Sequence, residues 1–225
     1  MTAKGTGRRR PRLDEDGLAG WEELGRDDEL EDVVLSGDFS WAEIELAALR
    51  QSRVEGAVFT RARLVRGSFV DCVIVDSEWS GAELEDCRFE RVEFRHCRMS
   101  GVQVDLNTFT DVALVDCTVE GGNFRMSRWE RAELRDSHLV ECDFTGASLP
   151  GSAILGCDLT DADLSTCDLA GARLHGTRLD GVRGGDALRG TTLGSDQLVP
   201  AALAVFRALK VTIDDEDDDD EGDGG

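Results

Sequence analysis

Apolar residues recur at every fifth position of the chain over residues 39–179. All 29 positions of this large column hold Phe, Trp, Ile, Leu, Val or Met, and no insertion shifts the register. A small column of 30 positions runs two residues ahead of it over 37–182, and holds Ala, Cys, Ser, Gly or Val except at Thr177 and Asn107. The 41 charged residues between positions 36 and 180 all lie outside the two columns.

A period of five fits neither a 3.6-residue helix nor a two-residue strand. It fits a chain that is extended through the small and large positions, which then share one side, and that turns through the other three. Such a unit cannot bury its apolar side alone and must stack on copies of itself. The pattern therefore predicts a β-solenoid that encloses both columns and leaves the charged side chains in solvent. Asn107 is then an inward polar residue that needs a hydrogen-bond partner, for which the backbone of the next coil is a candidate.

The columns resemble the pentapeptide-repeat family, whose motif A(D/N)LXX is matched by Ala162, Asp163 and Leu164. The resemblance covers residues 36–182. It implies an all-β fold, a right-handed quadrilateral β-helix with five residues per side and twenty per coil. We number the four sides by the large residues at their centres in the first coil: Phe39 the first, Ile44 the second, Leu49 the third and Val54 the fourth. With this coil length, Phe69, Phe89, Phe109 and Trp129 are expected to form one aromatic pile inside the third side.

The chain is expected to contain four segments. These are a basic start followed by an acidic capping segment (1–35), the solenoid (36–182), a helical cap (183–213) and an acidic tail (214–225). We expect residues 1–12 and the acidic tail to be disordered, because neither can bury enough apolar surface. Residues 13–35 are expected to form a short helix or strand over the first coil.

The C-terminal segment predicts an amphipathic helix. Gly184 and Gly185 break the register, and Val199, Leu203, Phe206 and Leu209 then fall on one apolar helix face, together with Ala202. Such a helix is expected to cap the open strand edges of the last coil. In the gyrase-protecting branch of the family a similar module also joins two subunits. The resemblance therefore implies a homodimer through this helix.

The sequence contains few candidates for catalytic residues. The three histidines fall on different sides or coils, and an uninterrupted solenoid offers no cleft. The stretch 157–174 contains two cysteines and four aspartates, but the coil would point Cys157 and Cys167 inward on opposite sides and the aspartates outward. All seven cysteines stand in the small column, where a buried thiol packs as a small apolar group. Cys97 and Cys117 would be neighbours at a separation compatible with a disulfide, which a cytoplasmic setting disfavours. We predict no catalytic, cofactor or metal site and a non-enzymatic function.

The net charge of the chain limits the classes of partner that it is expected to bind. The chain has a formal net charge of −22, which disfavours direct binding to nucleic acid through the short arginine cluster at residues 8–12. It contains no run of 18 apolar residues and no export signal, so we expect a cytoplasmic protein without a membrane partner.

The negative charge is concentrated on two adjacent sides. The second side has a net charge of −5 and the first side −4, while the fourth and third sides have −2 and 0. The candidate acidic partner-binding face consists of Glu43, Glu45, Glu78, Glu83, Glu85, Asp105, Asp143 and Asp163. The chain resembles the Qnr/MfpA-type pentapeptide proteins, which implies that it mimics duplex DNA at DNA gyrase or topoisomerase IV and protects them from quinolones. The alternative is a structural scaffold whose charge-mixed surface serves an unknown protein partner.

Overall fold

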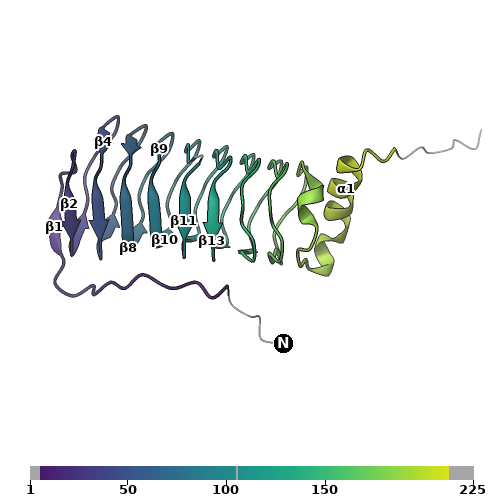
Figure 1. The fold of residues 1–225 in the computed structure, drawn as a ribbon, viewed down its shortest axis with the longest axis horizontal. Helices are drawn as coiled ribbons and strands as arrows, with labels where there is room; N and C mark the ends of the chain where they lie inside the picture. Colours follow the sequence, from purple (N-terminus) through teal and green to yellow (C-terminus); the bar gives the residue numbers. More distant parts are fainter. Residues whose placement is uncertain (1–5, 105, 213–225) are drawn as a thin grey trace, which may run out of the picture.

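The structure, a computed structural model, describes residues 6–104 and 106–212. Its backbone winds into a stack of coils (Figure 1), in which the bridged residues between positions 38 and 183 pair, in parallel, with the residue twenty positions later. On the first side Asp38 pairs with Val58, which pairs with Glu78. The predicted β-solenoid with twenty residues per coil is confirmed.

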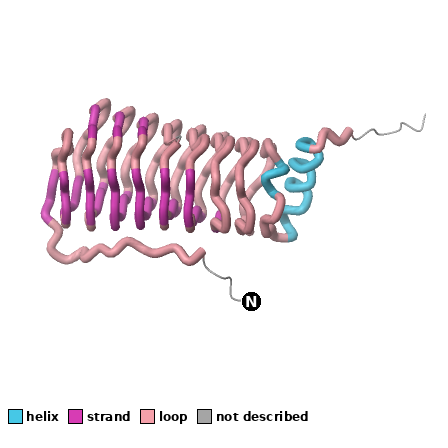
Figure 2. Tube along the Cα trace, in the orientation of Figure 1, coloured by secondary structure: helices cyan, strands magenta, loops and turns pink. Residues whose placement is uncertain are grey.

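Each side contributes a short extended segment, and the turns between sides interrupt the strands (Figure 2). The elements are β1 (Ala19–Trp21), β2 (Glu29–Glu31), β3 (Val33–Leu35), β4 (Glu43–Glu45), β5 (Ala48–Arg50), β6 (Arg53–Glu55), β7 (Arg63–Val65), β8 (Ser68–Val75), β9 (Glu83–Glu85), β10 (Arg88–Arg95), β11 (Thr108–Thr110), β12 (Ala113–Val115), β13 (Arg128–Glu130), β14 (Glu133–Arg135), β15 (Ala153–Leu155), η1 (Gly185–Leu188), η2 (Ser195–Gln197) and α1 (Leu198–Ala208). Strands β8 and β10 are longer because they continue through the corner between the third and fourth sides.

The large column forms the core, as predicted. Phe89 stacks between Phe69 and Phe109 at ring-centroid distances of 5.0 and 5.2 Å, and Trp129 extends this pile at 3.9 Å from Phe109. Full burial of each such side chain stabilises the fold by roughly 1.5–3 kcal/mol. A second pile, formed by three aromatic residues of the first side, has the same twenty-residue spacing in the sequence but was not predicted; its members are Phe39, Phe59 and Trp79.

Residues of the small column also form hydrogen bonds. Five of its seven cysteines, with Asn107 and Thr177, donate to the backbone carbonyl of the large residue 23 positions earlier, on the preceding coil, whereas four serines donate to carbonyls two or three positions earlier. Cys72 Sγ donates to the carbonyl of Leu49 at 3.4 Å, and Thr177 Oγ1 donates to that of Ile154 at 2.8 Å. Cys, Thr and Asn can therefore replace Ala here, because each brings a donor for a buried carbonyl.

All seven cysteines are buried free thiols. Burial raises the pKa of Cys72 and Cys142 to about 12 and that of Cys87 to about 11. Because the thiolate is the reactive form, these groups are unreactive in the folded chain.

The first coil is built from strands rather than a helix. Strands β1, β2 and β3 pair with β3, β5 and β6, and the offset from Glu29 to Ala48 is nineteen residues instead of twenty. Leu24 and Leu35 are buried here and close the N-terminal end of the core.

Helix α1 stands across the C-terminal end of the stack (Figure 1). It packs through Ala201 and Ala204, which are buried. The backbone of Gly185 lies so close to Ala204 that a Cβ at Gly185 would approach its carbonyl within 2.3 Å. Small residues thus make the capping contact. None of the helices in the described residues is long and apolar enough to cross a membrane.

Residues 6–17 run along the outside of the stack, back from the first coil toward the middle (Figure 1). We expected disorder over residues 1–12, but residues 6–12 contact the solenoid through Arg8, Arg9 and Arg12. The prediction considered this segment alone, and its arginines find carboxylates that only the coil brings together. Residues 1–5 and the predicted acidic tail from residue 214 lie outside the described residues.

Candidate interaction surfaces

The second side carries one outward column of polar residues at twenty-residue spacing. From Glu43 the backbone pairing leads to Arg63 and Glu83, and later to Asp143 and Asp163. The column places acids and arginines on the same line, with Gln103 and Asn123 between them. Asp105, the remaining member predicted for this side, lies outside the described residues.

Most of the predicted acidic residues pair with an arginine. The nearest N–O distances are 2.5 Å for Glu45–Arg66, 2.7 Å for Glu85–Arg63, 2.9 Å for Asp143–Arg125, 3.0 Å for Asp163–Arg183 and 3.4 Å for Glu78–Arg98. Surface pairs of this kind contribute only about 0–1 kcal/mol each, so a partner can replace the arginine at low cost. Glu43 and Glu83 are exposed, and within the described residues neither has an ion pair.

Asp143 and Asp163 also close their own turns. Asp143 Oδ1 accepts the backbone N–H of Thr145 at 2.8 Å, and Asp163 Oδ1 accepts that of Ser165 at 2.9 Å. Burial alone would raise the pKa of Asp143, but the hydrogen bonds from Thr145 and the Arg125 guanidinium outweigh it and lower the pKa. Sequence reasoning treated these aspartates as surface charges only, because a turn carboxylate and a solvated one look alike in a five-residue repeat.

Large apolar side chains flank the second side at its corners. Trp41 is 66% exposed and its ring lies under the guanidinium of Arg61, 4.8 Å from the ring centroid. On the opposite corner Leu106 and Met126 are 70% and 56% exposed. Sequence reasoning missed these residues, although each interrupts a turn position that mostly holds Asp, Arg or Gly. An acidic strip bordered by apolar anchors has the composition of a protein-binding surface.

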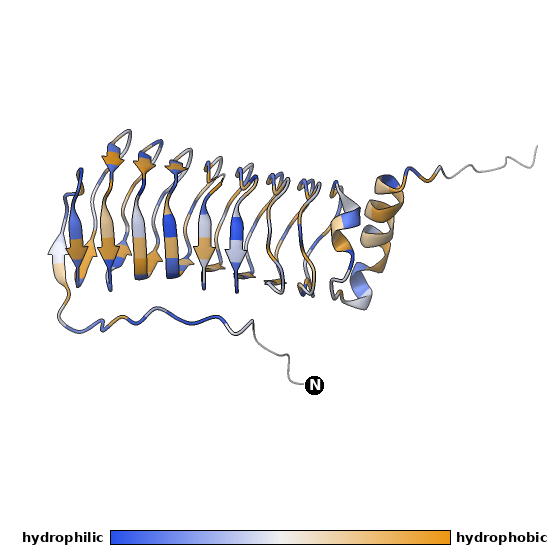
Figure 3. Ribbon diagram, in the orientation of Figure 1, coloured by the Kyte–Doolittle hydropathy of each residue, from blue (hydrophilic) through white to orange (hydrophobic). Residues whose placement is uncertain are grey.

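The N-terminal segment makes the charge distribution more asymmetric. Its four arginines at positions 8, 9, 10 and 12 lie against the third and fourth sides, whose own net charge is −2. Residues 6–17 also contain Asp14, Glu15 and Asp16, so these two sides together with residues 6–17 have a net charge of −1, while the first and second sides keep −9. Figure 3 shows the hydrophilic character of this segment.

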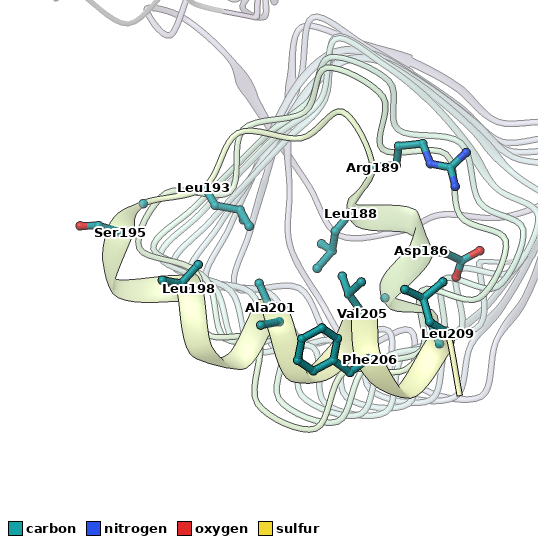
Figure 4. Close-up of a pocket in the computed structure, with 14 residues that line it drawn as sticks. Asp186, Leu188, Arg189, Leu193, Ser195, Leu198, Ala201, Val205, Phe206 and Leu209 are labelled. Carbon is teal, nitrogen blue, oxygen red and sulfur yellow. The ribbon is translucent and has the colours of Figure 1, made fainter. Parts of the chain in front are cut away.

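The C-terminal end has an apolar hollow of about 930 Å³ between α1 and the last coil (Figure 4). Leu188, Leu198, Val205 and Phe206 contribute to its walls. The predicted cap or dimer residues Val199, Leu203, Phe206 and Leu209 are all exposed, by 42–67%. They do not cap the coil. The helix instead packs on the coil end through Ala201, Ala204 and the partly buried Val205.

The acidic and cysteine-rich stretch 157–174 brings no ligands together. Cys157 and Cys167 are buried, while the carboxylate of Asp158 accepts hydrogen bonds from Thr160 and Arg178. Within residues 6–104 and 106–212, no group of three or more His, Cys, Asp or Glu is placed to hold a metal ion.

Comparisons with known proteins support the fold. Residues 87–174 match a family model described as a pentapeptide repeat region. Full-length QnrB1, a plasmid-mediated fluoroquinolone resistance protein, is 20% identical over 85% of this chain and 99% of its own, with a TM-score of 0.51. HetL from the cyanobacterium Nostoc sp. strain PCC 7120, a pentapeptide repeat protein involved in heterocyst differentiation regulation, is 16% identical over 76% of this chain and 89% of its own, with a TM-score of 0.49. No curated protein sequence matches the chain.

These identities establish similarity of fold and leave function to the surfaces of this chain. Residues 87–174 are thus similar to a pentapeptide repeat region, and the two five-residue columns continue the same pattern over residues 37–182 with a coil of twenty residues.

Proposed function

We propose that the chain is a non-enzymatic interaction rod, and that its first and second sides bind a type II topoisomerase, DNA gyrase or topoisomerase IV, in place of DNA. The observation that carries the proposal is the net charge of −9 on these two adjacent sides, opposite a face that the N-terminal arginines bring close to neutral. A rod that is polarised in this way is steered toward a basic DNA-binding surface in one orientation. The proposal also requires the cytoplasmic location expected from the sequence.

The likeness to QnrB1 adds a reason to test this class of partner first, since QnrB1 is described as a fluoroquinolone resistance protein. The two acidic sides carry a lower charge density than duplex DNA, so they mimic DNA only in part. Seven coil steps from Asp38 to Arg178 span about 34 Å at ~4.8 Å each, and duplex DNA of that length carries about 20 charges. Nine net charges cover less than half of these. Apolar contacts from Trp41, Leu106 and Met126 are therefore expected to contribute to affinity.

A supercoiling assay tests the proposal. Gyrase and relaxed plasmid are incubated with increasing amounts of the chain, with and without a quinolone. We expect inhibition of supercoiling, rescue from the quinolone, or both. The variant Glu43→Lys/Glu83→Lys, which reverses the two acids without an ion pair, should lose the effect with unchanged melting temperature. Asp143 is unsuitable for this test because it closes a turn.

A charge-matched control distinguishes an effect of the acidic sides from an effect of the overall net charge. Glu55→Lys/Glu130→Lys makes the same change on the fourth and third sides, at side chains that are half exposed or more. This variant should keep full potency. If the chain neither inhibits nor protects, or if both double variants lose potency equally, the topoisomerase proposal is wrong.

One observation favours a different partner. Five acids of the predicted face pair with arginines, so the surface presents both signs of charge. Such a surface suits a protein partner that is itself charge-mixed, as expected for a scaffold. Binding that persists in the Glu43→Lys/Glu83→Lys variant would favour this second function.

We propose further that the chain is a homodimer through α1. Leu198, Leu203 and Phe206 expose 42–70% of their surface at the end of the rod, beside the apolar hollow (Figure 4). A second copy would bury these side chains, because a two-fold interface joins one patch to itself. Light scattering should give twice the chain mass of 24.5 kDa, and Phe206→Asp should give a monomer. A monomeric wild-type chain would refute this.

A further inference from the structure

The corner between the third and fourth sides carries a ladder of opposite charges. Its positions at twenty-residue intervals are Asp71, Arg91, Asp111 and Arg131. Arg91 donates to both oxygens of Asp71 at 2.7 Å, and Arg131 donates to those of Asp111 at 2.6 and 3.0 Å. Each aspartate is thus held in one orientation by a two-pronged contact.

Residues 6–12, which we call the N-terminal strap, lie on this ladder without regular secondary structure. The backbone N–H of Arg12 donates to Asp71 Oδ1 at 2.9 Å, and that of Arg9 donates to Asp111 Oδ1 at 3.0 Å. Three extended residues span about 10 Å. Two coil steps, from Asp71 to Asp111, span about 9.6 Å. The spacing of the two aspartates therefore matches the distance between the N–H groups of Arg9 and Arg12.

Two arginine side chains of the strap enter the site. Arg9 Nε donates to Asp111 Oδ2 at 2.8 Å, and the Asp111 side chain is fully buried. Arg8 is buried between two carboxylates of the fourth side, with Nε 3.1 Å from Glu133 and one terminal nitrogen 3.3 Å from Glu93. Its side chain is only 6% exposed, and its Nη1 has no hydrogen-bond partner in the described residues. Arg10, by contrast, is exposed and within the described residues has no ion pair.

Burial of three carboxylates on the outer surface is costly unless each is paired. Burial would raise the pKa of Asp111, but the guanidiniums of Arg131 and Arg9 and the Arg9 N–H outweigh it, and the pKa lies below its ordinary value. The sequence predicted these acids to be solvated, because the arginines that cover them lie 59 to 125 residues away along the chain.

We propose that this corner, formed by Asp71, Glu93, Asp111 and Glu133, is a recognition site for an extended arginine-rich peptide, and that the N-terminal strap occupies it in cis. Asp71 and Asp111 accept backbone N–H groups of the peptide, the two glutamates bind the side chain at the Arg8 position, and Asp111 also binds the side chain at the Arg9 position. A basic segment of another protein fits the same contacts and competes with the strap. A short flexible tether gives the strap an effective concentration of about millimolar, so a competitor must exceed that threshold.

A peptide-binding experiment with the full chain tests the site. A fluorescein-labelled peptide with the sequence of residues 6–12, TGRRRPR, is titrated with wild type, with Arg8→Ala/Arg9→Ala and with the control Arg10→Ala. Anisotropy should show binding to Arg8→Ala/Arg9→Ala at least about tenfold tighter than to wild type, because the freed site no longer holds its own strap. Arg10→Ala should bind like wild type. Equal binding by all three proteins would overturn the proposal.

Attraction of any cation to a chain of charge −22 is the competing explanation. A permuted peptide of identical composition, RPRTRGR, has the same charge but a different arginine spacing. It should bind Arg8→Ala/Arg9→Ala at least tenfold more weakly than TGRRRPR, and equal binding would refute recognition. Amide hydrogen exchange on the wild-type chain is an independent readout: the Arg9 and Arg12 amides should be protected, and exchange at free-peptide rates would show that the site is not occupied in cis.

Discussion

Replacing Asn107 tests the hydrogen-bonding role of the small column. Asn107 is 1% exposed and bonds twice to the preceding coil: its Oδ1 accepts the N–H of Cys87 at 2.7 Å, and its Nδ2 donates to the carbonyl of Leu84 at 2.5 Å. Asn107→Ala removes both bonds and leaves two buried backbone groups without these partners. Each such group costs about 1–3 kcal/mol, so we expect a loss of about 2–6 kcal/mol in the free energy of unfolding.

Asn107→Cys is the graded control. A cysteine keeps a donor for the Leu84 carbonyl, as Cys87 does for Leu64 at 3.4 Å, but cannot accept well from the Cys87 N–H. It should therefore lose only about 1–3 kcal/mol. Urea denaturation followed by circular dichroism measures both values. A loss below about 0.5 kcal/mol for Asn107→Ala, the usual range for surface substitutions, would refute the reasoning, as would equal losses for the two variants.

The remaining predictions concern the core, the thiols and the buried carboxylates. Phe89→Ala should destabilise by about 3–5 kcal/mol in the same assay, because the paired strands on both sides prevent collapse of the cavity; a loss below 1 kcal/mol would contradict the inward pile. Ellman's reagent should titrate none of the seven thiols in the folded chain and all seven in denaturant, and fast reaction of a native thiol would contradict their burial. Asp71 and Asp111 have lowered folded pKa values, so their stabilisation is present above about pH 4, the unfolded pKa of aspartate, and is lost as pH falls through the folded values. Unfolding free energies at pH 6 and pH 2.5 should show this loss, and a smaller one in Asp111→Asn; equal losses in both proteins would argue against it.

The solenoid follows from the sequence because its determinants are local and repeated. Each large residue, such as Phe89, occupies the same position in its coil as its neighbours twenty residues away, so one inference applies to the whole column. A backbone partner for Asn107 was also foreseen, because an inward amide has few alternatives, but it was expected on the next coil and lies on the preceding one.

The surface contacts join residues that are far apart in the sequence, and the five-residue repeat does not specify which residues meet. Arg8 meets Glu93 and Glu133 only after the coil has aligned them, and the sequence separation of 125 residues gives no sign of it. The helix face was likewise assigned from its apolar pattern alone. Whether Phe206 or Ala204 meets the last coil depends on the space beside Gly185, which the helical period does not specify.

Competition between the chain and DNA for gyrase tests the central functional claim most directly. Gyrase is held on immobilised duplex DNA, and the wild-type chain is added at increasing concentration. We predict that the wild-type chain displaces DNA from gyrase in proportion to the amount of chain bound. The variant Glu43→Lys/Glu83→Lys should not displace DNA. A complex that contains gyrase, DNA and the chain together would contradict the claim that the two acidic sides occupy the place of DNA.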